Sequence, residues 1–515
     1  MNEASLPEPD QAAALAFLDK QVARGAAKRV DTHASIVYLA PERVLKIKRA
    51  VRLPFLDYST LEKRKAACEE ELVVNRRFAP DIYRRVVAIT RGHDGPEVGG
   101  SGPAIEWAVE MARFDENKTL DHLARAGQLT PELAEALADV LRDAHRPAEK
   151  SDGASWLASI ATFIERNTRK FREQPALAHD AIERLHELSH RRLKVNRPLL
   201  EARASAGLVR RCHGDAHLGN LVLIDGKPVL FDAIEFDPVI ATTDILYDLA
   251  FPLMDLIHFG LHAGANRLFN RYLQASWQEN ADALALLPLF LSVRAAIRAH
   301  VLFTRCEQAP DDAEDAIAAR SYFDLALKLL EPVRPSLIAI GGKSGTGKSV
   351  LARDAAPLLA PLPGAVLLRS DVIRKELHGV EALVALPQAA YAHDVTVRVY
   401  RTLYDRARQV IAQGFSVILD AAFLHASERD ELAAEARDMQ AEYRPVFLDA
   451  DLAVRLARIV ERRRDASDAN AQVAAGQDSY DIGRLDWPVI DASGTPEQTL
   501  ARSIVRLGIA GWSGP

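Results

Sequence analysis

Residues 342–349 have the types and the order of a loop that holds phosphate groups. They read Gly342-Lys343-Ser344-Gly345-Thr346-Gly347-Lys348-Ser349 and match G-x-x-x-x-G-K-[ST] at every fixed position. Glycines let the backbone approach phosphates closely, and the N–H groups at the start of the following helix point toward them. In this pattern Lys348 reaches the β- and γ-phosphates, and the Ser349 hydroxyl binds Mg²⁺. The residues, hereafter the glycine loop, therefore predict a site for ATP and Mg²⁺.

A second group of residues with the spacing of phosphoryl-transfer chemistry lies near the middle of the chain, in the stretch His213–Asn220 and at Asp232. In such a set, an aspartate on a loop accepts the proton of the substrate hydroxyl. An asparagine five residues later and an aspartate after a hairpin hold Mg²⁺. This pattern makes Asp215 the candidate base, with Asn220 and Asp232 as metal ligands.

A lysine in a strand and a glutamate in a helix precede this group. Lys46 is the candidate for pairing with the phosphates, and Glu71 is its candidate partner. Lys48 falls on the same face of the strand, and Glu69 and Glu70 are neighbours of Glu71, so the choice within each set stays open.

The elements expected to position these residues change in kind along the chain. A helix over 9–25, a hairpin of strands over 35–40 and 44–48, and a helix over 61–78 precede strands near 85–89 and 105–111. The last strand has the place of a hinge, where backbone groups of Glu110 and Met111 would meet an adenine edge. Residues 115–210 are strongly helical in pattern.

After two prolines in the segment 331–335, strand and helix patterns alternate, which is typical of a parallel sheet covered by helices. We therefore expect a bilobal α+β domain over 1–330, with a small lobe at about 30–111 and a helical lobe at about 112–330. A linker over 331–335 and an α/β domain over 336–515 follow.

The first domain resembles the aminoglycoside phosphotransferase-like, or choline kinase-like, branch of the protein kinase-like fold. The resemblance rests on residues 212–220 as the catalytic loop, 230–232 as the metal-binding segment and 244–250 as the structural segment after it. It implies Mg·ATP as cofactor and a hydroxyl as acceptor. One departure is the segment 32–35, which has no glycine where the family has a glycine-containing nucleotide loop.

The C-terminal half resembles the small P-loop kinases, a group that includes gluconate, shikimate and adenylylsulfate kinases and zeta-toxin-like proteins. The chain as a whole is thus similar to fusions of an aminoglycoside phosphotransferase-like domain with an ATP-binding domain. The resemblance implies that Asp371 contacts the acceptor hydroxyl and that Arg374 grips the substrate. Asp420, at the end of an apolar strand, corresponds to a Walker B-like Mg²⁺ ligand, and Arg462 to a lid arginine that contacts phosphate. The alternative role of Asp371 and Asp420 is that of a helix N-cap, and the alternative role of Arg374 is that of a partner in a surface ion pair.

The bulk composition is that of an ordinary globular protein. The 515 residues are 48% hydrophobic and 26% charged, with a net charge of −6 and three cysteines without metal-ligand spacing. The first residues lack the pattern of a secretory signal, and the most apolar window, 284–293, is too short to span a bilayer. We expect a cytoplasmic protein without membrane association, and the acidic balance argues against nucleic acid as a partner.

These patterns predict an ATP-dependent kinase with two modules, each transferring a phosphoryl group from Mg·ATP to a hydroxyl of a small molecule. Two alternatives remain. In the first, one domain serves as a nucleotide-sensing or scaffold module; the N-terminal domain is the candidate because segment 32–35 has no glycine. In the second, the P-loop domain acts on nucleic acid ends. The sequence leaves both acceptors and the oligomeric state undetermined.

Overall fold

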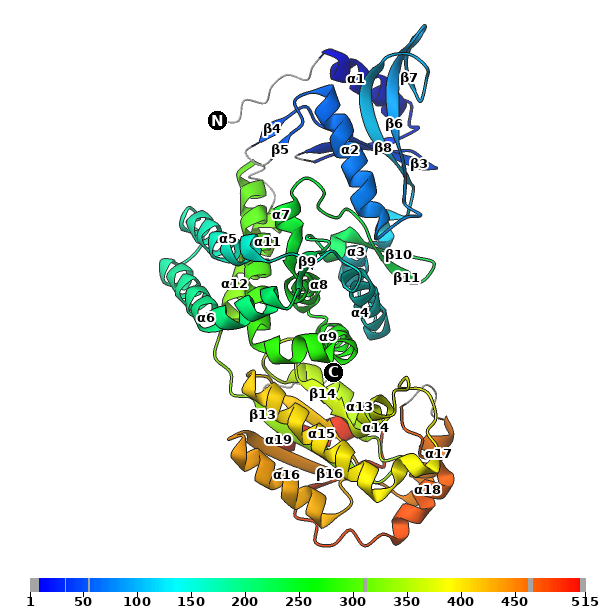
Figure 1. The fold of residues 1–515 in the computed structure, drawn as a ribbon, viewed down its shortest axis with the longest axis vertical. Coiled ribbons are helices and arrows are strands. Elements are labelled where there is room, and N and C mark those ends of the chain that lie inside the picture. Colours follow the sequence, from blue (N-terminus) through cyan, green and yellow to red (C-terminus); the bar gives the residue numbers. More distant parts are fainter. Residues whose placement is uncertain (1–8, 33, 54–55, 309–312, 462–465, 510–515) are drawn as a thin grey trace. The chain divides into compact units, whose positions relative to one another are not determined.

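The computed structural model describes residues 9–32, 34–53, 56–308, 313–461 and 466–509 (Figure 1). By their internal contacts these form two compact units, each described by itself. The first combines residues 1–163 with 197–255, and the second combines 164–196 with 256–515. Residues 256–330 therefore group with the C-terminal half, whereas the sequence placed them with the N-terminal domain. The expected boundary at 331–335 stays a prediction, and this grouping decides how experiments on the halves should be designed.

The N-terminal part of the first unit is a six-stranded antiparallel sheet in the order β1-β2-β3-β8-β6-β7. Its elements are α1 (Pro9–Ala23), β1 (Lys28–Asp31), β2 (Ser35–Leu39), β3 (Arg43–Lys48), β4 (Arg52–Leu53), β5 (Leu56–Asp57), α2 (Leu61–Arg76), β6 (Tyr83–Gly92), β7 (Gly95–Val98) and β8 (Ala104–Ala112). The expected helices and strands are all present, and β1 and β7 are additional strands.

Alternation along β3 decides which of its side chains face the site. Leu45 and Ile47 pack in one apolar cluster with Ala14 and Leu18 of α1. Val44, which directly precedes Leu45, belongs to a different cluster that includes Cys68 of α2. Because side chains of a strand alternate between faces, Lys46 and Lys48 lie on the α2 face.

Helices and short strand pairs follow. They are α3 (Leu120–Arg125), α4 (Pro131–His145), α5 (Ala154–Arg172), α6 (His179–Ser205), β9 (Val209–Arg211), β10 (Leu221–Ile224), β11 (Lys227–Leu230), α7 (Pro238–Ala241), β12 (Thr242–Asp244), α8 (Ile245–His258), α9 (His262–Ala275), α10 (Trp277–Asn280), α11 (Leu287–Gln308) and α12 (Ala313–Lys328). The predicted hairpin of β10 and β11 turns through Asp225 and Gly226, both at positive φ. Among the described residues, one stretch, Trp277–Glu307, is long and apolar enough to cross a bilayer. Because 78% of its most apolar window is buried inside the protein, we interpret it as core helix.

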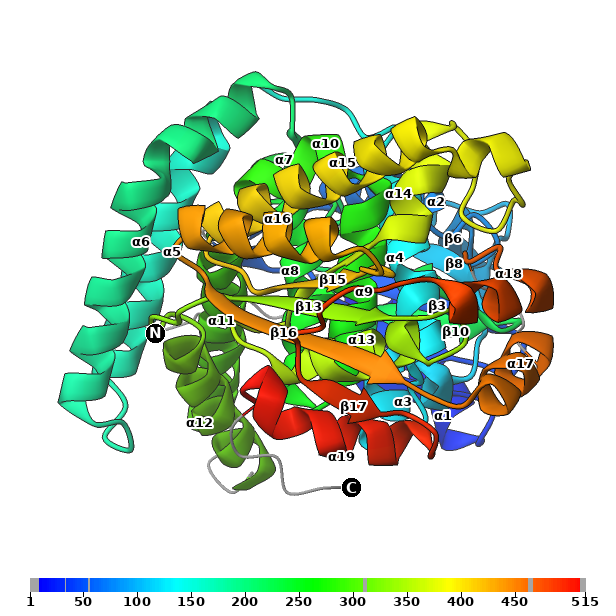
Figure 2. The same cartoon turned by 90° about the horizontal axis from the view of Figure 1, so that it is seen from below.

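The C-terminal half is a parallel sheet in the order β14-β15-β13-β16-β17. Its elements are β13 (Ser336–Gly342), α13 (Lys348–Ala355), β14 (Val366–Arg369), α14 (Ser370–Leu377), α15 (His393–Ala412), β15 (Val417–Asp420), α16 (Ala426–Asp438), β16 (Glu442–Asp449), α17 (Leu452–Glu461), α18 (Ala471–Gly476), β17 (Val489–Asp491) and α19 (Pro496–Leu507). Helices α13 and α19 cover one face of this sheet, and α15 and α16 cover the other (Figure 2).

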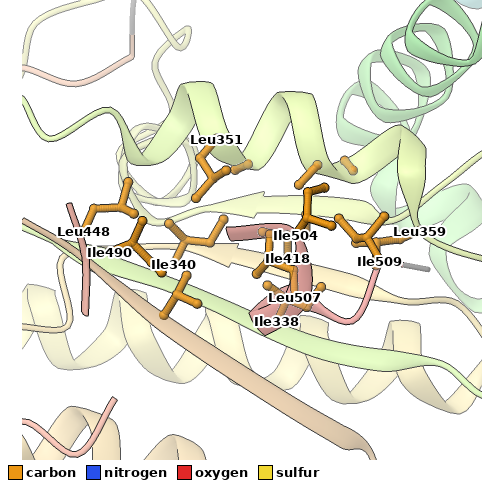
Figure 3. Close-up of a cluster of buried hydrophobic side chains, with 14 of the residues drawn as sticks. Ile338, Ile340, Leu351, Leu359, Ile418, Leu448, Ile490, Ile504, Leu507 and Ile509 are labelled. Carbon is orange, nitrogen blue, oxygen red and sulfur yellow. The ribbon is translucent and has the colours of Figure 1, made fainter. Parts of the chain in front are cut away.

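The core under α13 and α19 is almost entirely aliphatic. Leu351 of α13 and Ile504 and Leu507 of α19 pack against Ile340 of β13 and Ile418 of β15 (Figure 3). Burial of such side chains contributes roughly 1.5–3 kcal/mol each. This packing fixes the carboxyl ends of β13 and β15, where the glycine loop and Asp420 lie.

Helix α9 closes the outer edge of the sheet. Asn270 Oδ1 accepts a hydrogen bond of 2.7 Å from the backbone N–H of Leu367 in β14. The side-chain amides of Asn266 and Asn270 donate to the carbonyl of Ala365, at 3.0 and 3.1 Å. Two asparagines one helical turn apart thus take the place of a neighbouring strand.

Candidate active site

The glycine loop joins β13 to α13 in a conformation that requires glycine. Gly342 and Gly345 have φ of +140° and +85°. A Cβ on Gly342 would lie 2.5 Å from the carbonyl oxygen of Leu448, and one on Gly345 would lie 2.6 Å from that of Arg455. The backbone is therefore wrapped as a phosphate cradle demands, and α13 begins at Lys348 with its N–H groups at the loop.

Three predicted residues meet at this cradle. Lys348 Nζ donates to the carbonyl oxygen of Lys343 at 3.0 Å. Ser349 Oγ donates to Asp420 Oδ2 at 2.6 Å. A hydroxyl and a carboxylate in contact are the oxygen ligands that Mg²⁺ prefers, so the donor set and the cradle fit Mg·ATP.

Arg369, at the end of β14, was missed by the sequence analysis. Its Nε donates to Asp420 Oδ2 at 3.1 Å and its Nη2 to Ser349 Oγ at 3.0 Å. The guanidinium thus contacts both proposed metal ligands. The residue lies directly before Ser370 and Asp371 in the sequence, and only its position at the carboxyl end of a strand could have indicated it.

Asp371 and Arg374 lie on the first turns of α14, which begins directly after β14. Burial raises the pKa of Asp371 above its ordinary value, and the nearby carboxylate of Asp420 raises it further. Arg374 is buried, donates to the carbonyl oxygen of Ala390 at 2.8 Å and lies over the ring of Tyr391. Its Nε is buried and has no hydrogen-bond partner among the described residues.

A cavity of about 1060 Å³ opens in front of the glycine loop. Its walls contain the glycine-loop residues Ser344 to Ser349 together with Asp371, Arg374 and Asp420. The structure therefore brings most of the residues predicted in the C-terminal half into one hollow, which has the size of a ligand site. Tyr391, Tyr400, His425 and Glu428 line it as well and were not predicted.

Basic residues reach the glycine loop from α17. Arg458 Nη1 donates to the carbonyl oxygen of Thr346 at 3.4 Å, and buried Arg455 donates to that of Ser344 at 3.4 Å. Arg462, the lid arginine predicted from the sequence, lies outside the described residues. Lys343 points to Asp478, with 2.8 Å between its Nζ and the carboxylate.

The first unit holds the second candidate site, in which both strand lysines share one glutamate. Glu71 is fully buried and lies 2.9 Å from Lys46 Nζ and 2.6 Å from Lys48 Nζ. Lys46 also pairs with Asp232, and Lys48 with Glu235. Burial alone would lower the pKa of Lys46, but Asp232 and Glu71 raise it well above its ordinary value. Glu71 thus pairs with both lysines, and Lys46 is the one that also reaches Asp232.

Asp215 and Asn220, the candidate base and a candidate metal ligand, contact each other. Asn220 Nδ2 donates to the side chain of Asp215 at 3.1 Å and to its carbonyl oxygen at 3.0 Å. Asp232 has a φ of 60°, and its backbone N–H donates to the Tyr83 hydroxyl. Burial would raise the pKa of Asp232, but the charge of Lys46 outweighs this and lowers the pKa below its ordinary value. These oxygen ligands suit a hard divalent cation.

Glu110 and Met111 do not lie where a hinge would use them. Met111 is opposite Val44 of β3 and Tyr83 of β6, so this part of β8 has strand partners on both sides. The Glu110 carboxylate pairs with Arg85 at 3.0 Å. The register argues against an adenine contact by these two backbones, and Arg113 and Phe114 are the first residues beyond the paired stretch.

Comparison with known proteins agrees with the C-terminal geometry. A family model described as AAA domain matches residues 337–481. The C-terminal half is a P-loop domain. Proteins of Mycobacterium tuberculosis and Mycobacterium bovis, each described as uncharacterized, are 28% identical to the chain over 490 residues. The match covers 92% of this chain and 94% of each relative.

Solved structures align with each part separately. A gluconokinase from Sinorhizobium meliloti is 20% identical and covers 34% of this chain and 94% of its own, with a TM-score of 0.26. A choline/ethanolamine kinase family protein from Mesorhizobium loti is 13% identical and covers 62% and 95%, with a TM-score of 0.37. By its own topology, the chain combines a six-stranded antiparallel sheet in its N-terminal part with a five-stranded parallel sheet, which carries the glycine loop, in its C-terminal half.

Proposed function

We propose that the chain is an ATP-dependent phosphotransferase with two sites, each transferring the γ-phosphoryl group of ATP to a hydroxyl of a small molecule. The observation that supports this most strongly is the contact of Ser349 with Asp420 at the glycine loop, beside Lys348 and a cavity containing Asp371. This reaction requires groups that bind the phosphates and neutralise their charge, and a carboxylate next to the acceptor hydroxyl.

In the P-loop domain, Lys348 and the loop N–H groups would hold the donor phosphates, and Ser349 and Asp420 would hold Mg²⁺. When bound, Mg²⁺ neutralises charge on the phosphate oxygens. Asp371 would accept the proton of the acceptor hydroxyl as its oxygen bonds to the γ-phosphorus and ADP leaves. Arg374 would orient the acceptor.

In the first unit, Asp215 would be the corresponding base, Asn220 and Asp232 would hold Mg²⁺, and Lys46 would pair with phosphate. The lowered pKa of Asp232 and the buried Lys46–Glu71 pair support a working site. A non-catalytic nucleotide-sensing module is the second candidate. It is supported by the hairpin between β1 and β2, where Asp31 pairs with Ile36 across a turn without glycine.

The test is a phosphorylation screen of hydroxyl metabolites with labelled ATP, run on the full chain. Lys348→Ala should abolish transfer to one set of acceptors and Asp215→Asn transfer to another, while the double variant loses both. If Asp215→Asn changes no product, the N-terminal site is the non-catalytic module. If the double variant keeps every product of the wild type, the two-site proposal is wrong.

A further inference from the structure

Two histidines and a glutamate meet on the helices α5 and α6, in the part of each that belongs to the second compact unit. His186 and His190 are four residues apart on α6, so their side chains lie on one face of that helix. Glu165 of α5 faces them. None of the three residues belongs to the two candidate active sites.

The ligand atoms of the three side chains lie within 4.8 Å of one another. His190 Nε2 and Glu165 Oε1 are 2.9 Å apart, and the centroids of the two imidazole rings are 4.5 Å apart. Ligand atoms around a tetrahedral Zn²⁺ lie roughly 3.3 Å from one another. Small rotations of these partly exposed side chains would reach that spacing.

His190 Nε2 lies 2.9 Å from Glu165 Oε1 without the alignment of a hydrogen bond. The atom is shielded from solvent, and it has no hydrogen-bond partner among the described residues, although Glu165 is near. A lone pair directed at a metal ion would satisfy it, because metal coordination replaces the missing hydrogen bond.

Thr168 fixes the tautomer of the other histidine. Its hydroxyl donates to the carbonyl oxygen of Ile164 at 2.9 Å, so its oxygen is left to accept from His186 Nδ1, which lies 3.2 Å away. A proton on Nδ1 leaves Nε2 of His186 with a free lone pair. Metal-binding histidines are oriented in this way, by a hydrogen bond from the second ring nitrogen.

We propose that Glu165, His186 and His190 bind a divalent transition-metal ion, and that Zn²⁺ is the ion their ligand set fits. Two imidazoles and one carboxylate form a known Zn²⁺ set in which the fourth position is open to water. Mg²⁺ prefers oxygen ligands alone, which separates this site from the two predicted Mg²⁺ sites. The ion would join α5 to α6.

The experiment is a Zn²⁺ titration of the untagged, chelator-treated full chain against a chromophoric chelator, with excess Mg²⁺ present to occupy the oxygen sites. The wild type should bind one competing equivalent of Zn²⁺. His190→Gln and His186→Gln should weaken that equivalent by at least about 10-fold, the loss that outer-shell changes already cause. His179→Gln is the matched control, because it removes an exposed histidine from the same helix, 83% accessible and outside the cluster.

Two further measurements guard against a folding artefact. Circular dichroism should match among the variants, and Glu165→Gln, which keeps size, provides a third ligand variant. Co²⁺ should give a visible absorption band in the wild type and His179→Gln that is lost in His190→Gln. A wild type without competing Zn²⁺, or an equal loss in His179→Gln, would overturn the proposal.

Discussion

Ser349 Oγ donates a 2.6 Å hydrogen bond to Asp420 Oδ2, joining the first turn of α13 to the end of β15. The two residues are 71 positions apart in the chain, yet the parallel pairing of β13 with β15 brings their strand ends together. Arg369 contacts both and completes a closed set of polar groups at the glycine loop.

Asp420→Asn should raise the Mg²⁺ concentration needed for half-maximal ATP turnover by the P-loop domain. The substitution keeps the size but removes a negative charge next to Ser349. Hydrogen bonds and contacts to charged groups contribute about 1.5–3 kcal/mol, so an increase of at least about tenfold is expected. An Mg²⁺ titration of turnover measures it. An unchanged midpoint would exclude Asp420 from the metal site.

Lys348→Ala should reduce ATP turnover by the P-loop domain about 10²–10³-fold, because a positive charge that stabilises the transition state is removed. Lys343→Ala is the neighbouring comparison and should cost less, since the Lys343 ammonium already pairs with Asp478. Steady-state kinetics in an Asp215→Asn background isolates this site. Equal effects of the two lysine substitutions would contradict the assigned roles.

The pH profile should report on Asp371. Its pKa lies above the ordinary value because of burial and Asp420, so the acid limb of the activity should lie at higher pH than for an exposed aspartate. The charge of Arg369 lowers the pKa of Asp371. Arg369→Gln removes this charge and should therefore move the acid limb further toward high pH. A shift toward low pH would show that another group is titrating.

The glycine loop could be predicted from the sequence because its chemistry is local. Eight consecutive residues carry the phosphate cradle, and their φ values and close contacts follow from where glycine is required. The sequence was equally informative about Asp215, Asn220 and Asp232, because a loop and a hairpin fix their spacing.

Other features depend on long-range packing that no local pattern encodes. The sharing of Glu71 by Lys46 and Lys48 needs the angle between α2 and β3. The role of Arg369 needs the register of β14 with β15. The pairing of β8 with both neighbours, which argues against a hinge at Glu110 and Met111, extends further than the apolar run of β8 indicates.

Lys46→Met and Lys48→Met should have different effects, although both lysines contact Glu71. Lys46 also contacts Asp232, so its loss should abolish phosphoryl transfer by the first unit. Lys48 is buried and balances Glu235, so its loss should destabilise the fold by about 3 kcal/mol. Denaturant unfolding and turnover, measured in a Lys348→Ala background, separate the two effects. Identical profiles for both variants would show that the lysines are equivalent.

Asp215→Asn and Asp232→Asn should separate base from metal ligand in the same background. Asp215→Asn should leave Mg·ATP binding intact while transfer falls by orders of magnitude. Asp232→Asn should weaken Mg·ATP binding itself, with partial rescue at high Mg²⁺. Calorimetry with a non-hydrolysable nucleotide measures the binding. If binding is unaltered in Asp232→Asn and neither the wild-type site nor the variant turns over, this unit is not a kinase.

The asparagine pair on α9 has a consequence for the chain outside the active sites. An uncovered outer strand offers a row of N–H and C=O groups to which a strand from another molecule can add. Asn270 occupies the N–H of Leu367 in β14, and Asn266 and Asn270 occupy the carbonyl of Ala365 directly before the strand, so the fused helix protects the P-loop domain from association through that edge. A fragment that starts at Ser336 would lose this cover and expose a strand edge to which other molecules can add. This holds even if its catalytic groups are intact.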